Sequence, residues 1–146
     1  MYKADDLDLL LSSFKPYVLA VEAALVARGF QAIPFDTWRS PKEAAKYAAL
    51  KVGQANSMHI YKVACDHICA LHGWECKKNK CEFFQAYGQE VERVGMIWGG
   101  RFKSRFDAPH MQACTIADQD RVRTIADEVA RDAFIRARLC KPLHAA

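Results

Sequence analysis

The sequence lacks the features of disordered, fibrous or repetitive chains. Its 146 residues include only 7 glycines and 5 prolines, and neither an internal repeat nor a low-complexity linker interrupts them. Hydrophobic residues make up 51% and charged residues 26%, a balance typical of chains that fold around a core. We therefore expect residues 1–146 to form a single domain with one core and one site.

Concentrated charge is also missing. Twenty-one Lys and Arg residues against 17 Asp and Glu give a net charge of +4, and no run of five or more like charges occurs. This pattern disfavours a nucleic-acid partner, which a clustered basic patch would indicate. A small positive charge is compatible with approach to anionic polymers through screened attraction.

No segment resembles a membrane span or a secretory signal. No stretch approaches the roughly 18 to 20 apolar residues of a membrane helix, and the first residues carry Asp5, Asp6 and Asp8 in place of an apolar signal core. We expect no membrane insertion and a cytoplasmic location. Any action outside the cytoplasm would then need another protein to release the chain.

The hydrophobic pattern predicts an α+β fold. Apolar residues at spacings of three and four indicate amphipathic helices, whereas short runs rich in aromatic and β-branched residues indicate strands. We expect a small antiparallel sheet packed by the helices at 7–28 and 82–94. In full, the predicted helices are 7–28, 40–50, 82–94 and 116–140, and the predicted strands are 30–38, 60–71 and two short ones within 96–114.

Two pairs of residues have the chemistry of a hydrolytic metal site. His59 precedes Asp66 by seven residues, and Asp107 precedes His110 by three. Zinc in a hydrolase is held by three protein ligands and keeps a fourth position open for water. We expect His59, Asp66 and His110 to be these ligands and Asp107 to be the separate carboxylate that accepts the proton of the attacking water.

Other polar residues are candidates for contacts with substrate. Arg39 stands at the end of a predicted strand, where a cation would hold a polarised carbonyl oxygen or a substrate carboxylate. Ser57 is either a substrate contact or a cap for nearby backbone amides. Trp98 is either part of the core or a wall of a cleft. His67, next to Asp66 in a strand, is expected on the opposite face and outside the metal site.

Six cysteines are expected to be reduced thiols, because no secretory signal is seen. Cys76 and Cys81 flank the turn Lys-Lys-Asn-Lys, and whether they pair or help to bind a metal is open. A zinc module built on Cys65, Cys69, Cys76 and Cys81 is an alternative, although its spacing fits no zinc finger well.

The motif Ser57-x-His59-x(4)-Ala64-x-Asp66, followed by Asp107-x-x-His110, resembles peptidase family M15, the D-alanyl-D-alanine carboxypeptidases and L-alanyl-D-glutamate endopeptidases. In addition, Trp38-Arg39-Ser40 resembles the Tyr-Arg-Ser segment of that family, and residues 98–112 resemble its phage endolysin branch. The resemblance covers about residues 7–114. Residues 115–146 form an unmatched C-terminal helix and tail.

The resemblance implies a hedgehog/D-Ala-D-Ala peptidase-like fold whose sheet carries zinc on His59, Asp66 and His110. It also implies that Asp107 is the catalytic base and that Arg39 contacts substrate. The implied protein is a monomeric, phage endolysin-like endopeptidase that cuts peptidoglycan stem peptides at a bond such as L-alanyl-D-glutamate. It would leave the host bacterial cytoplasm with the help of a holin-like protein.

Two alternative functions stay open at this point. One is a D-alanyl-D-alanine carboxypeptidase, and the other is a non-catalytic relative that keeps zinc for stability or binds cell wall or protein. The sequence also departs from the family pattern at Lys62, where the motif has glycine. If the backbone there has positive φ, lysine costs about 1 kcal/mol and would shift His59.

Overall fold

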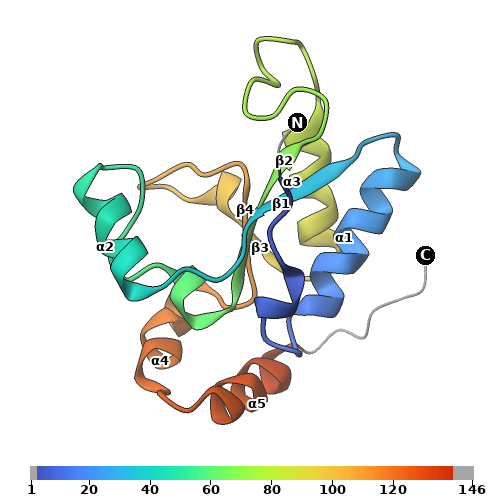
Figure 1. Ribbon diagram of the computed structural model, residues 1–146. Coiled ribbons are helices and arrows are strands. Elements are labelled where there is room, and N and C mark those ends of the chain that lie inside the picture. Colours follow the sequence, from blue (N-terminus) through green and yellow to red (C-terminus); the bar gives the residue numbers. More distant parts are fainter. Residues whose placement is uncertain (1–2, 140–146) are drawn as a thin grey trace.

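A four-stranded antiparallel sheet lies at the centre of the computed structural model, which describes residues 3–139 (Figure 1). Its strands follow the order β1-β2-β4-β3, and every neighbouring pair is antiparallel. This arrangement confirms the predicted α+β class and the small antiparallel sheet. The strands are β1 (Ala32–Asp36), β2 (Ala64–Cys69), β3 (Ile97–Trp98) and β4 (His110–Gln112).

Helices flank this sheet on both sides. The helices α1 and α3, which were predicted to pack on the sheet, lie side by side against one face. The helix α2 lies beyond the other face, and α4 and α5 lie below the sheet in this view (Figure 1). No helix within residues 3–139 is long and apolar enough to cross a membrane. The helices are α1 (Lys15–Ala27), α2 (Pro41–Ala49), α3 (Phe83–Arg93), α4 (Gln119–Thr124) and α5 (Glu128–Arg138), with 3-10 turns at Leu7–Leu9, Met58–Tyr61, Gly99–Arg101 and Ile116–Asp118.

Strand β2 separates the core from the site, because successive side chains of a strand point to opposite faces. His67 is fully buried between α1 and α3, where its Nδ1 lies 3.0 Å from Tyr87 Oη and its Nε2 lies 2.9 Å from Glu22 Oε1. The neighbouring Asp66 points the other way, toward His59. His67 is therefore a core histidine, as expected.

The first helix, predicted over 7–28, begins only at Lys15. Ahead of it, the backbone N–H of Ser13 donates to Asp132 Oδ1 at 2.9 Å, a contact with α5 that the local pattern does not contain. Pro16 occupies the first turn, where its missing N–H and fixed φ suit a helix start. The boundary in the prediction was wrong because a tertiary contact holds the preceding segment.

The helix predicted over 116–140 is broken in two, and its last residue lies outside the described part of the chain. The side chain of Asp127 accepts a hydrogen bond from Ala130 N at 2.8 Å and so caps α5. Arg131 donates from Nε and Nη2 to the carbonyl oxygen of Ile125, at 3.2 and 3.1 Å. These two side chains satisfy the backbone groups that a break leaves unpaired.

The strand predicted over 60–71 is shorter, because Lys62 ends the preceding 3-10 turn with φ 63° and ψ 27°. Lys62 therefore takes the left-handed conformation for which the family motif has glycine. Its Nζ lies 2.6 Å from Glu128 Oε1 and 5.9 Å from the centre of the Trp38 ring. The C-terminal helix thus helps to hold the lysine in place.

We expect the left-handed backbone at Lys62 to make substitutions there depend on the shape of the side chain. Lys62→Val should destabilise the fold by about 1–2 kcal/mol relative to Lys62→Gly, because a β-branched residue is strained at positive φ. Urea unfolding of both variants measures the difference in free energy. Equal stability of the two would contradict the conformation described for Lys62.

Candidate metal centre and its cleft

Three side chains that bind metals converge on the face of the sheet opposite α1 and α3. Asp66 on β2 is the direct antiparallel partner of His110 on β4, and His59 comes from the 3-10 turn before β2. Asp66 Oδ1 lies 3.1 Å from His59 Nε2 and 3.0 Å from His110 Nδ1. The three predicted ligands are therefore brought together, with one donor atom of each within 4.8 Å of the others.

Hydrogen bonds on the outer side of each imidazole fix which nitrogen points inward. His59 Nδ1 donates to the carbonyl oxygen of Thr37 at 2.8 Å, and His110 Nε2 donates to Gln112 Oε1 at 2.8 Å. Gln112 is oriented in turn, because its Nε2 donates to the carbonyl oxygen of Cys114 at 2.8 Å. Carbonyl oxygens only accept, so in the neutral form of each imidazole the inner nitrogen turns a lone pair toward Asp66, and it donates to Asp66 only when the ring is protonated.

Two imidazole lone pairs and one carboxylate oxygen thus face a common point, an arrangement that fits a cation. Burial disfavours ionisation of Asp66, but the charge and hydrogen bonds of His59 and His110 outweigh burial and hold its pKa well below the usual range. Burial lowers the pKa of His110, and the hydrogen bond to Asp66 outweighs it, so the net pKa is raised. A metal ion and a proton therefore compete for the inner nitrogen of His110.

Asp107 lies beside the cluster of His59, Asp66 and His110 but is not part of it. Its Oδ2 is 3.9 Å from His110 Nδ1, and its side chain is 43% exposed to the cleft. Partial burial, followed by the negative charge of Asp66, raises the pKa of Asp107 above its usual value. A carboxylate with a raised pKa next to a metal site is suited to accept and return a proton.

The loop that carries Asp107 depends on Gly99. A Cβ atom at Gly99 would lie 2.3 Å from the carbonyl oxygen of Asp107 and 2.9 Å from His110 Cβ, so a side chain there would displace both. Trp98 braces the same loop, because its Nε1 donates to the carbonyl oxygen of Ala108 at 2.8 Å. Its ring packs on Gly100, which identifies Trp98 as a packing residue.

Arg39 and Ser57 both line the cleft, but each already has a protein partner. Arg39 is 8% exposed, and its guanidinium binds Asp36 Oδ2 through Nε at 3.1 Å and also through Nη2. Ser57 Oγ accepts a hydrogen bond from His59 N at 3.3 Å, which is the capping geometry. Their roles in substrate binding remain predictions.

The three candidate metal ligands lie in a cleft of about 630 Å³. Basic side chains predominate over acidic ones on its walls, and Asp66 and Asp107 are the acidic residues among those that line it. Trp74 and Arg123 also reach the cleft, and no sequence pattern predicts either of them, because only folding brings them near the site. The basic lining residues are Arg39, Arg101, Lys103, Arg105 and Arg123.

Comparisons with known proteins agree with this geometry. Residues 51–113 match the family described as D-alanyl-D-alanine carboxypeptidase, and this span contains His59, Asp66, Asp107 and His110. The crystal structure of Serratia marcescens L-Ala D-Glu endopeptidase ChiX is similar, with a TM-score of 0.57 and 19% identity, over 81% of this chain and 92% of that chain. No match was found among curated proteins.

The matched family segment and the donor set confirm the resemblance found in the sequence. Residues 51–113, the part of the chain that matches this family, contain the donor set of a metallopeptidase. The match with the solved structure supports the fold over most of both chains.

We expect Gln112→Met to weaken zinc binding about 10- to 100-fold, because His110 then loses the acceptor that fixes its tautomer. Zinc affinity measured by competition with a chromophoric chelator tests this. The matched control is Gln119→Met, which alters another glutamine of the cleft wall without touching a ligand. Equal zinc affinity in the two variants would exclude Gln112 as an orienting residue.

Proposed function

We propose that the chain is a zinc-dependent peptidoglycan endopeptidase that hydrolyses a stem-peptide bond such as L-alanyl-D-glutamate. The observation that carries this proposal is the convergence of His59, Asp66 and His110 with Asp107 beside them. Two nitrogens and one oxygen are the donors that a catalytic zinc site of the three-ligand type uses.

The roles of the residues follow from their positions. Zinc, when bound, would supply Lewis acidity that polarises a carbonyl and lowers the pKa of water to about 7. Asp107 takes the proton of the attacking water and delivers it to the leaving amine, because it is close to the ligands yet exposed to the cleft. Arg39 is proposed to hold a carboxylate or the developing oxyanion at the cleft wall.

The charge of the cleft favours an anionic peptide. Peptidoglycan stems carry free carboxylates, including that of D-glutamate, and Arg101, Lys103 and Arg105 line one part of the cleft. Arginine binds carboxylates through paired hydrogen bonds, which gives orientation as well as attraction. The relative ChiX is an L-Ala D-Glu endopeptidase by its title, and this bond is the one we propose for the present chain.

A second candidate is removal of a terminal D-alanine, since the matched family is described as D-alanyl-D-alanine carboxypeptidase. Both reactions use the same metal chemistry and differ in which end of the stem peptide occupies the cleft. A non-catalytic relative is a third reading, and the presence of Asp107 next to the complete ligand set argues against it.

We also propose that the protein acts in lysis as a phage endolysin does. In this proposal it accumulates in the host bacterial cytoplasm, is released by a holin-like protein and cuts the cell wall as a monomer. The support is the resemblance of residues 98–112 to the endolysin branch of the family. Release of a reporter from host cells, with and without a co-expressed holin, would test this role.

Mass spectrometry of peptidoglycan digested by the zinc-loaded protein tests the proposed reaction. We expect new termini at L-alanine and D-glutamate with the wild type and a loss of at least about 100-fold in rate with Asp107→Asn, because a general base contributes about that much or more. Released D-alanine would establish the carboxypeptidase instead.

The control for this experiment is the zinc content of the variants. Asp107→Asn should keep zinc, because Asp107 is not a proposed ligand. His110→Ala should lose both zinc and hydrolysis, because His110 is one of the three proposed ligands. If Asp107→Asn lost zinc as fully as His110→Ala, Asp107 would be a ligand and not the base. If neither product appeared from a folded, zinc-containing wild type, the non-catalytic reading would replace the proposal.

A further inference from the structure

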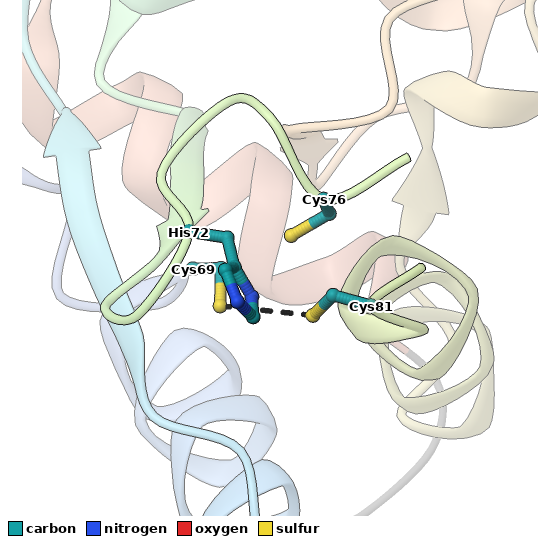
Figure 2. Close-up of side chains that lie close together, drawn as sticks. All are labelled: Cys69, His72, Cys76 and Cys81. Atoms are coloured by element: carbon teal, nitrogen blue, oxygen red, sulfur yellow. Dashed lines mark hydrogen bonds between the residues drawn. The ribbon is translucent and has the colours of Figure 1, made fainter. Parts of the chain in front are cut away.

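A second cluster of metal-binding side chains lies outside the cleft, at the last residue of β2 and in the segment between β2 and α3. Cys69, His72, Cys76 and Cys81 point toward one another, and one donor atom of each lies within 4.8 Å of the others (Figure 2). This segment rises beyond one end of the sheet (Figure 1). The mechanism proposed for the cleft uses none of these four residues.

The spacing of the sulfur atoms is that of a metal site and not of a disulfide. Cys69 Sγ and Cys81 Sγ are 3.9 Å apart. Two thiolates on a tetrahedral zinc ion, each about 2.3 Å from the metal, are about 3.8 Å apart, whereas a disulfide brings the sulfur atoms to about 2.05 Å. Cys69, Cys76 and Cys81 are all free thiols in the structure.

His72 gives independent evidence for a ligand at this place. Its Nδ1 is buried and has no hydrogen-bond partner within residues 3–139. A buried polar atom without a partner costs about 1–3 kcal/mol, so such atoms are rare and call for an explanation. A bond from Nδ1 to a metal ion would satisfy this atom.

The backbone of the segment brings the four residues together although it forms no helix or extended ladder. Gly73 N donates to the carbonyl oxygen of Cys69 at 2.7 Å, and Cys81 N donates to that of Cys76 at 2.8 Å. Lys80 has φ 55°, a conformation that is uncommon for a residue with a side chain. Such a backbone persists where surrounding contacts determine it.

We propose that Cys69, His72, Cys76 and Cys81 bind one structural zinc ion, separate from the ion in the cleft. Three thiolates and one imidazole complete a tetrahedral shell and leave no position for water, as in structural zinc sites. The bound group would carry a net charge of −1, and the same segment contains three lysines and one glutamate, Lys77, Lys78, Lys80 and Glu75.

Two points that the sequence left open bear on this assignment. The zinc module considered from the sequence was wrong in one ligand, Cys65. Its Sγ lies on the buried face of β2, 3.9 Å from His67 Nε2. The fourth member of the cluster is His72. Cys76 and Cys81 are not paired with each other in the structure. The sixth cysteine, Cys140, lies outside the described residues.

The second ion would fix one wall of the catalytic cleft. Trp74 lies between His72 and Cys76 in the chain and lines the cleft, and its ring contacts Phe35 of β1 edge to face at 5.0 Å. With 47% of its surface exposed, Trp74 has few contacts of its own to hold it. The four-residue zinc shell therefore supplies the rigidity that this part of the wall otherwise lacks.

Elemental analysis of the full chain, purified under reducing conditions in the presence of zinc, tests the proposal. We expect two zinc ions per wild-type chain and one in each of His72→Ala, Cys76→Ser and His59→Ala. The control Cys65→Ser changes a buried thiol outside the cluster and should keep two. A single ion in the wild type that disappears in His59→Ala would overturn the second site while leaving the cleft site intact.

Cobalt substitution tests the second site in a protein whose four cluster residues are unchanged. In the double variant His59→Ala/His110→Ala, bound Co²⁺ should still show intense near-ultraviolet bands of thiolate-to-cobalt charge transfer. These bands should disappear in Cys76→Ser but not in Cys65→Ser. Absence of these bands from the double variant would overturn the proposal. A protein mass two hydrogen atoms too low under reducing conditions would also overturn it, because it would show a disulfide within the cluster.

Discussion

The hydrogen bonds that the two imidazoles make away from the site are the interactions on which the metal centre depends. His59 is tied to a backbone carbonyl of residue Thr37, and His110 is tied to Gln112, which is itself held by the backbone of Cys114. Without these acceptors each ring would be free to turn or to carry its proton on the inner nitrogen. With these acceptors in place, the inner nitrogens of both imidazoles and the Asp66 carboxylate are held facing the same point.

The sheet is what makes this fixation possible. Direct pairing of Asp66 with His110 across β2 and β4 sets their side chains on one face, and the alternation of β2 sends His67 into the core between α1 and α3. The same strand ends at Cys69, the first residue of the second cluster. One short strand thus links the catalytic ligands, the core and the proposed structural ion.

Much of the fold and the identity of the site residues could be predicted from the sequence. The capping sequence Ser40-Pro41-Lys42-Glu43 placed α2 and periodicity placed α3 almost to the residue. The family motif gave His59, Asp66 and His110, although the last lies far along the chain. Spacing alone does not bring these residues together. The expectation that they meet in one site came from the family resemblance. The pairing of β2 with β4 is the physical reason that Asp66 and His110 meet.

The features that could not be predicted are those set by contacts between distant segments. The late start of α1 reflects the bond from Ser13 to Asp132, and the break before α5 reflects a cap that periodicity does not detect. His72 has no motif that marks it as a ligand. It joins the three cysteines because the turn at Gly73 folds the segment back onto β2.

Anomalous diffraction at the zinc absorption edge, from crystals of the wild-type protein, would show directly whether zinc binds between His59, Asp66 and His110. We expect a zinc peak at about 2.0–2.2 Å from His59 Nε2, His110 Nδ1 and an Asp66 oxygen. The outer nitrogens of both imidazoles should still be hydrogen-bonded to Thr37 and Gln112. A fully loaded crystal with no peak at this point, or with zinc bonded to an outer nitrogen, would contradict this expectation.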